Sequence, residues 1–271
     1  MTQQTSNTQA GSTRNSYRKS HGGKGVAPLF GLLPLAVLLL IWQIFGNPHS
    51  VFFPQPNRWL TAINSLQQQG TLWTSILATA STFVQSIIVA TLIGTTLGLA
   101  LGSINWGGKA LDPLLDFLRN LPAAALVPAA AIVLGTNTKM ALVIVVFSSV
   151  WPILLSTRSA IMNLSPVLSS SITNLRLSGP RRTSVMIGSA LPGILLGVRV
   201  AAPLALIVTL LAEFITNLSG VGALILSAQQ NFNSAEVYAL LLLAGVLALV
   251  VNSIVSAIEA SVLRRHGPVT T

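Results

Sequence analysis

Long apolar stretches separated by short polar segments are the feature that most constrains the fold of this chain. They cover residues 26–45, 75–101, 114–134, 140–155, 191–215 and 237–261. An apolar helix of about 20 residues crosses about 30 Å of hydrocarbon at 1.5 Å per residue. Only 7% of the 271 residues are charged and 52% are hydrophobic, whereas soluble domains carry about 25% charged residues. The sequence therefore predicts an all-α, polytopic integral membrane protein of about six transmembrane helices.

Two of these spans are irregular. Pro122 and Pro128 interrupt the third span, and the fourth span is short. We expect both to tilt, to break or to lie partly within the protein, because backbone polar groups freed by proline need partners away from lipid.

The two ends of the chain lack this apolar character. Residues 1–25 are rich in Ser, Thr, Gln, Asn and Gly, carry four basic residues and contain no Val, Ile, Leu or Phe. Such a segment cannot bury enough apolar surface to order itself, so it is predicted to be a disordered basic tail. Residues 26–265 form the predicted transmembrane domain and residues 266–271 a C-terminal tail. A cleaved signal peptide is the alternative for residues 26–45, but its apolar core is usually shorter and ends at a small-residue cleavage site.

The distribution of Lys and Arg predicts the orientation in the membrane. If the N-terminus is cytoplasmic, the outer loops hold Arg58 and Lys139, and Arg119 and Arg199 lie in or at the ends of spans. The cytoplasmic segments then hold the other basic residues: Arg14, Arg18, Lys19, Lys24, Lys109, Arg158, Arg176, Arg181, Arg182, Arg264 and Arg265. Positive charge is enriched in cytoplasmic loops, so both termini are predicted to be cytoplasmic in a cell (plasma or inner) membrane.

The polar, basic segment 165–190 lies between the fourth and fifth spans. Ser165 and Pro166 are suited to the N-cap and first position of a short helix that continues to about Leu175. Gly179 and Pro180 interrupt that helix, and the segment ends in a predicted turn at Leu191, Pro192 and Gly193. It is either a loop whose arginines satisfy the positive-inside rule or an amphipathic helix that docks in a partner's groove. The candidate coupling residues are Ser165, Pro166, Leu168, Ser170, Ile172, Leu175, Arg176, Gly179, Arg181, Arg182, Leu191, Pro192 and Gly193.

Charged residues inside the spans are the other functional candidates. Arg199 and Glu213 lie on the fifth span, too far apart along one helix face to pair with each other. Intramembrane ionisable residues usually face a bundle interior or an aqueous path, so Arg199 is expected to snorkel or to tie helices together, and Glu213 to be a rim residue or a gate contact. Asp112 and Asp116 are expected to favour the positive end of a helix dipole, and Asp116 to pair with Arg119 three residues later.

Glycines recur at four-residue spacing on two spans. Gly94, Gly98 and Gly102 lie on the second span, and Gly193 and Gly197 on the fifth. This spacing permits close helix contact, either within the chain or with a second copy.

Several classes of chemistry are disfavoured. The chain has no cysteine, and no histidine lies within a span. It lacks a Walker A loop, a G-x-S-x-G elbow and an H-E-x-x-H motif. The basic residues are scattered rather than gathered on one face, which argues against nucleic acid. We therefore predict no enzymatic activity, no metal site and no cofactor, and an inability to hydrolyse ATP alone.

Residues 33–265 resemble the membrane-spanning permease subunits of ATP-binding-cassette importers, in the branch associated with nitrate, sulfonate, taurine and related solutes. The matching pieces are residues 111–114, residues 118–128 (LRNLPAAALVP), residues 151–157 (WPILLST), residues 191–194 with Gly197 and Arg199, and residues 212–214 followed by 219–222. Their order and spacing together are specific.

The resemblance implies a type I importer fold, ATPase subunits, an extracytoplasmic solute-binding protein and a second permease chain. It also implies that segment 165–190 is a coupling helix inserted into the ATPase, and that the outer loops 47–73 and 216–236 meet the binding protein. The chain departs from the family's Glu-Ala-Ala motif, since Ser169, Ser170, Ser171 and Ile172 occupy that region. This departure suggests a different partner subunit or a divergent ATPase.

Two other functions stay open. A neutral vitamin precursor is an alternative solute to a nitrate-like or sulfonate-like anion, because such precursors use similar permeases. A secondary transporter is a less favoured alternative, since such proteins commonly show repeated halves and several charges at the midplane.

Overall fold

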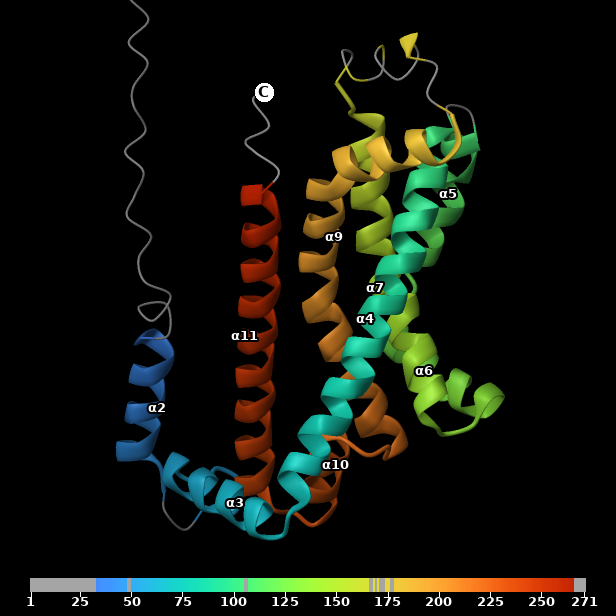
Figure 1. Cartoon of the computed structure of the whole chain (residues 1–271). Helices are drawn as coiled ribbons and strands as arrows, with labels where there is room; N and C mark the ends of the chain where they lie inside the picture. Colours follow the sequence, from blue (N-terminus) through green and yellow to red (C-terminus); the bar gives the residue numbers. More distant parts are fainter. Residues whose placement is uncertain are drawn as a thin grey trace, which may run out of the picture. The chain divides into compact units, whose positions relative to one another are not determined.

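The computed structural model describes residues 33–47, 50–104, 107–165, 168, 170, 174–175 and 178–265. Every regular element in this part of the chain is an α-helix, as predicted (Figure 1). The helices are α2 (Leu33–Phe45), α3 (Pro56–Gln68), α4 (Thr71–Ser103), α5 (Gly107–Arg119), α6 (Ala123–Leu134), α7 (Thr138–Met162), α9 (Gly179–Thr216), α10 (Val221–Gln230) and α11 (Ser234–Arg265). Contacts divide the chain into residues 1–45 and residues 46–271, which we describe separately.

In the second unit, four helices are long and apolar enough to cross a membrane: α4, α7, α9 and α11. The predicted third span is a broken one, because α5 and α6 are bent by 84° at the break between them. Pro122 ends the break as the N-cap of α6, and its missing N–H leaves no backbone donor unsatisfied there. In the first unit, α2 is an apolar helix of 13 residues, and the predicted start of its span at residue 26 lies outside the described residues.

Two spans are longer than their apolar runs. Helix α7 ends at Met162 rather than near residue 155, and α9 begins at Gly179, twelve residues before the predicted start at residue 191. The turn predicted at Leu191–Pro192–Gly193 is wrong, since Pro192 lies inside α9. A proline inside a helix removes one hydrogen bond and bends the axis. Figure 1 shows the first turns of α9 crossing one end of the neighbouring helices before the rest descends beside α7.

Helix α7 is the centre of this unit, between α4 and α9, and half of its most apolar stretch is buried. The two glycine rows explain how the backbones approach so closely. A methyl group at Gly98 of α4 would lie 2.7 Å from the Leu154 carbonyl oxygen of α7. One at Gly197 of α9 would lie 2.7 Å from the Ile153 Cα atom. The small-residue spacing on both helices therefore serves packing within the chain.

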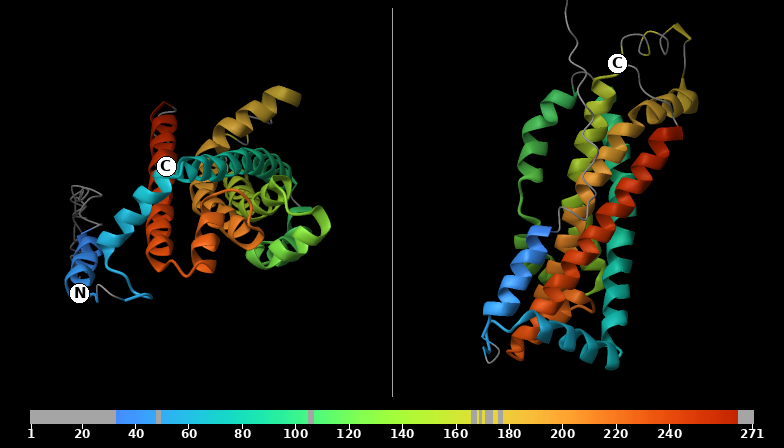
Figure 2. Two further views of the ribbon diagram at one scale, coloured as in Figure 1. Left: turned by 90° about the horizontal axis from the view of Figure 1, so that it is seen from below. Right: turned by 90° about the vertical axis from the view of Figure 1, so that its left-hand side faces the viewer.

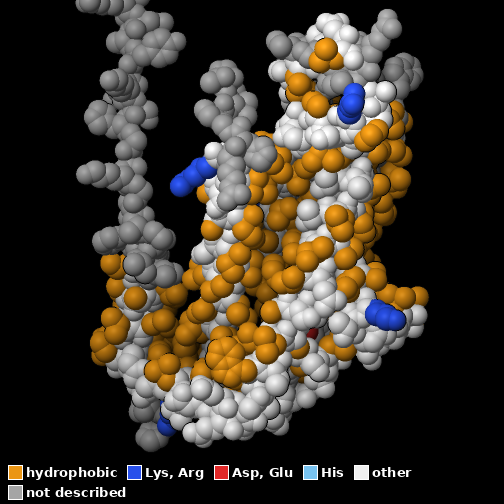
Figure 3. Space-filling model, viewed as in Figure 1, with side chains coloured by type: hydrophobic (Ala, Val, Ile, Leu, Met, Phe, Trp, Pro, Cys, Tyr) orange, Lys and Arg blue, Asp and Glu red, His pale blue; other side chains and the backbone are white. Residues whose placement is uncertain are grey.

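Helix α11 differs from α4, α7 and α9, because none of its most apolar stretch is buried. In the two views of Figure 2 it lies at the edge of these helices. Its first turns pack on α3 through stacked rings of Trp59 and Tyr238, whose centroids are 5.5 Å apart. Figure 3 shows apolar side chains covering the long helices, with few Lys and Arg side chains on this face. This surface is suited to lipid or to other apolar helices.

Candidate functional site

The two ends of the helices carry different polar groups, and we call them inner and outer after the orientation predicted from the sequence. The inner end is where α7 ends at Met162 and α9 begins at Gly179. Segment 165–190 comprises most of the connection between these helices and the first turns of α9. The outer end is where α9 ends at Thr216 and α11 begins at Ser234.

The first part of the candidate coupling segment starts with a capped helical turn. The Leu168 backbone N–H donates to the Ser165 Oγ atom at 3.3 Å, which is the N-cap contact predicted from the sequence. Leu168 and Ser170 are helical, and Leu175 is an exposed turn residue. Pro166, Ile172 and Arg176 lie outside the described residues.

The second part of the segment is the beginning of α9. Ser178 is the N-cap, and Gly179 has φ +55°, a conformation that favours glycine. Arg181 and Arg182 are exposed in the first turn. Gly179 and Pro180 thus mark the start of a new helix.

Apolar packing attaches this part of the segment to its neighbours. Met186, Ala190 and Ile194 of α9 form a buried cluster with Ile161 of α7, and Leu99 of α4 packs against it. The first turns of α9 are therefore fixed to the inner ends of α7 and α4.

A partly buried ion pair joins α5 to α7 at the inner end. The Arg158 Nη1 atom donates to the Asp112 Oδ1 atom. Arg158 is 8% exposed, and its Nε atom has no partner among the described residues. Asp112 and Asp116 are not in the first turn of α5, so the expected helix-dipole role is wrong. Asp116 pairs with Arg119 at 3.0 Å, as predicted.

Arg199, near the middle of α9, ties this helix to the last turns of α11. Its Nη1 atom donates to the Glu259 Oε2 atom at 2.9 Å. This agrees with the expected role of joining helices. Its charge is balanced by that carboxylate, so Arg199 gives little support to an anion-binding role.

Glu213 is the centre of a buried hydrogen-bond cluster at the outer end, which we call the outer cluster: Thr79, Glu213, Val221 and Gly222. The Glu213 Oε2 atom accepts from the Thr79 hydroxyl at 2.9 Å and from the Gly222 N–H at 3.0 Å. The Val221 N–H donates to the Thr79 Oγ1 atom at 2.9 Å. Glu213 is 1% exposed, so it is not a rim residue. It holds the start of α10 against α4 and α9.

The outer cluster also requires glycine on either side of Val221. Gly220 has φ +154°, and a methyl group there would overlap the Glu213 carboxylate. A methyl group at Gly222 would overlap the Leu210 carbonyl oxygen. The Ser219-Gly220-Val221-Gly222 sequence is therefore explained by contact with the Glu213 carboxylate and the α9 backbone.

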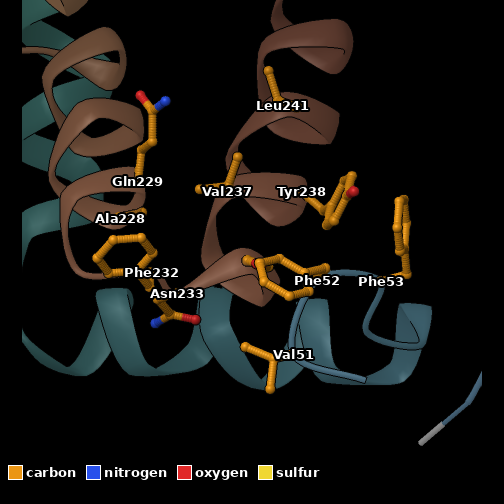
Figure 4. Close-up of a pocket in the computed structure, with 11 residues that line it drawn as sticks. Val51, Phe52, Phe53, Ala228, Gln229, Phe232, Asn233, Val237, Tyr238 and Leu241 are labelled. Carbon is orange, nitrogen blue, oxygen red and sulfur yellow. The ribbon is translucent and has the colours of Figure 1, made fainter. Parts of the chain in front are cut away.

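An apolar pocket of about 770 Å³ lies at the outer end, between the chain that precedes α3 and the α10–α11 turn. Figure 4 shows its aromatic side chains: Phe52 and Phe53 come from the chain before α3, Phe232 from the turn and Tyr238 from α11. Phe232 is 80% exposed and has φ +54°, which is uncommon for a bulky residue. The pocket brings together parts of the two outer loops expected to meet a binding protein.

The sequence does not predict the contacts Asp112–Arg158 and Thr79–Glu213. Arg158 was assigned to a cytoplasmic segment because the apolar run ends near residue 155, and Thr79 carried no distinguishing pattern. Opposite charges near the same predicted ends of two spans, Asp112 and Arg158, were the signal that could have suggested the inner pair.

Comparisons with known proteins all point to membrane components of transport systems. Residues 90–266 match the family described as Binding-protein-dependent transport system inner membrane component. The bicarbonate transport system permease protein of Synechococcus elongatus is 30% identical over 93% of this chain and 96% of its own length. The nitrate import permease protein of Synechocystis is 25% identical over 84% of this chain and 87% of its own. The taurine transport system permease protein of Escherichia coli is 23% identical over 87% of this chain and 89% of its own.

The family match covers the bent α5–α6 span, the central helix α7, segment 165–190 and the outer cluster apart from Thr79. The family match and the relatives together confirm the resemblance to importer permease subunits on which the sequence prediction relied. The chain belongs to the family of inner membrane components of binding-protein-dependent transport systems.

Proposed function

We propose that this permease subunit of an ATP-driven importer forms, with a second permease chain, the path for a small oxyanion such as nitrate, bicarbonate or a sulfonate. The observation that carries the proposal is the similarity along almost the whole chain to permeases named for bicarbonate, nitrate and taurine transport. Because Arg199 is paired with Glu259, the relatives rather than a free positive charge support the anion. A neutral vitamin precursor remains the second candidate solute.

ATP-driven movement enters through segment 165–190 in this proposal. Ser165 begins a capped turn after α7, and the first turns of α9 are packed on α7 and α4 through Met186 and Ala190. A force on the segment would therefore move the inner ends of three long helices together. Cytoplasmic ATPase subunits that close on ATP would supply that force and switch the side to which the path opens. The missing Glu-Ala-Ala carboxylate favours a divergent contact with the ATPase.

The extracytoplasmic binding protein would dock at the outer end. Helix α3 covers this end with a row of polar side chains, and the pocket of Figure 4 opens beside it. Phe52, Phe53 and Phe232 offer exposed rings to a partner, and aromatic residues are enriched in protein interfaces.

Both termini are proposed to be cytoplasmic. The excess of Lys and Arg in the segments assigned to the cytoplasm supports this orientation. A phosphatase fused after Arg265 should be inactive and a fluorescent protein in the same place should be bright. The reverse pattern would contradict the orientation.

Reconstitution tests the function. The chain is purified with the ATPase and binding protein encoded near its gene, placed in liposomes and supplied with labelled nitrate, bicarbonate, taurine or an alkyl sulfonate. We expect uptake of one of these solutes that needs ATP and the binding protein. Uptake driven by an ion gradient without ATP would indicate a secondary transporter. Failure of all four anions, with a neutral heterocycle transported instead, would contradict the proposed solute class.

A further inference from the structure

Helix α5 is attached to the rest of the molecule differently from α4 and α9. Those two helices contact α7 through glycines that bring the backbones together. Among residues 110–119 of α5, Leu115 is the one buried side chain. The inner ion pair between Asp112 and Arg158 is therefore a large part of what holds α5 to α7.

The position of Arg158 connects this pair to the coupling segment. Arg158 lies about one turn before the end of α7 at Met162, and the chain then reaches the capped turn at Ser165. The backbone of Arg158 also lies close to α4, because a methyl group at Gly102 would lie 3.2 Å from the Arg158 carbonyl oxygen. The backbone at Arg158 is thus packed firmly, and any displacement of the end of α7 displaces the guanidinium with it.

The position of Asp112 connects the same pair to the broken span. Asp112 lies in the middle of α5, which leads through the 84° bend into α6. Helix α6 packs into the core through its first half, where Val127 is fully buried with residues of α7 and α9. With α6 held there, a pull on Asp112 changes the bend between α5 and α6.

We propose that Asp112 and Arg158 are a positioning pair that makes α5, and with it the bent α5–α6 span, follow the coupling segment during the transport cycle. The inference deepens the proposed function and depends on it. Arginine is suited to this role, because its rigid guanidinium keeps its charge and holds a carboxylate in a defined direction. Asp112 keeps nearly half of its side chain exposed, so water can replace its contacts when the two helices separate.

A purely stabilising role is the alternative, and the two roles predict different measurements. A pair that only stabilises the fold would, when broken, lower the amount of folded protein and leave the remaining molecules fully coupled to ATP hydrolysis. A positioning pair would leave ATP hydrolysis working in molecules that transport poorly. The deciding quantity is therefore solute taken up per ATP hydrolysed, which does not depend on how much protein folds.

The test uses the complete transporter in liposomes with its ATPase and binding protein. For Asp112→Asn we expect ATP hydrolysis still stimulated by the binding protein, with uptake per ATP lowered about tenfold, within the 5–150-fold range typical of coupling between sites. The exchange variant Asp112→Arg with Arg158→Asp should recover part of that ratio. Asp116→Asn is the matched control, because Asp116 is on the same helix but pairs with Arg119 of its own helix.

Three outcomes would overturn the inference. The first is an unchanged uptake per ATP in Asp112→Asn, and the second is an equal fall of that ratio in Asp116→Asn. The third is that neither Asp112→Asn nor the exchange variant gives folded protein. The wild-type transporter separates this result from the proposed function. If the wild type shows no ATP-dependent uptake, the proposed function fails; if it does and Asp112→Asn matches it, the positioning role alone fails.

Discussion

The outer and inner ends of the helices around α7 are held by different kinds of polar contact. At the outer end, Glu213 is sealed from solvent and accepts hydrogen bonds from a hydroxyl and a backbone N–H. At the inner end, the ion pair Asp112–Arg158 joins α5 to α7, and Arg199–Glu259 joins the middle of α9 to the last turns of α11. Each pair has one partner that is about half exposed. Opening the outer cluster would strand buried donors, whereas an ion pair with an exposed partner can exchange its contacts for water. The difference indicates an outer end built to stay fixed and an inner end able to rearrange.

The largest effect is expected from crowding the outer end. In Gly222→Leu the new side chain has no space, because even a methyl group would overlap the Leu210 carbonyl oxygen. Overpacking typically costs about 1–3 kcal/mol and occasionally more, and here backbone rather than a side chain must move. We expect little folded protein by size-exclusion chromatography in detergent.

The control for this substitution is Gly245→Leu on α11, where nothing lies within 4 Å of an added methyl group. It should fold like the wild type. Equal yields of the two variants would show that the outer end is not rigid.

Removing the carboxylate should have the next largest effect. In Glu213→Ala the Gly222 N–H and the Thr79 hydroxyl lose their acceptor, and each buried donor left unsatisfied costs about 1–3 kcal/mol. Glu213→Gln keeps an acceptor and nearly the same volume. We therefore expect a much lower melting temperature for Glu213→Ala than for Glu213→Gln, measured by thermal unfolding in detergent. A larger loss for Glu213→Gln would mean that the negative charge, rather than the acceptor, holds α10.

The ion pair at Arg199 should matter less. Arg199 is 49% exposed on its side chain, and pairs of this kind contribute about 0–1 kcal/mol. Arg199→Gln is expected to lower the melting temperature slightly and to leave uptake per ATP unchanged, because this pair does not involve the α5–α6 span. An equal loss of coupling in Arg199→Gln and Asp112→Asn would show that inner-end charge in general, not the α5–α7 contact, governs transport.

Particular residues show how far the sequence could predict this molecule. The apolar runs placed α4, α7 and α11 within a few residues at most ends, since hydrocarbon thickness fixes the length of a span. The glycine spacing predicted close contact but not its partner, because the same spacing is suited to packing within a chain or between copies. The sequence does not predict the start of α9, because Gly179 and Pro180, which commonly interrupt a helix, are here the first residues of one. Asp112–Arg158 and Thr79–Glu213 join residues 46 and 134 positions apart, and no local pattern encodes such a distance.

The smallest effect is expected from Asp116→Asn, and it sharpens the comparison most directly. Asp112 and Asp116 are the same residue type one turn apart on α5, so their loss changes the charge of the inner end equally. Asp116, however, pairs with Arg119 on its own exposed helix surface, and such a pair contributes about 0.3–0.5 kcal/mol. If charge near the membrane surface were what mattered, both substitutions would lower uptake to the same extent, and added salt would weaken the difference from the wild type. If contact between helices is what matters, Asp116→Asn should match the wild type in melting temperature and in uptake at every salt concentration, while Asp112→Asn should not.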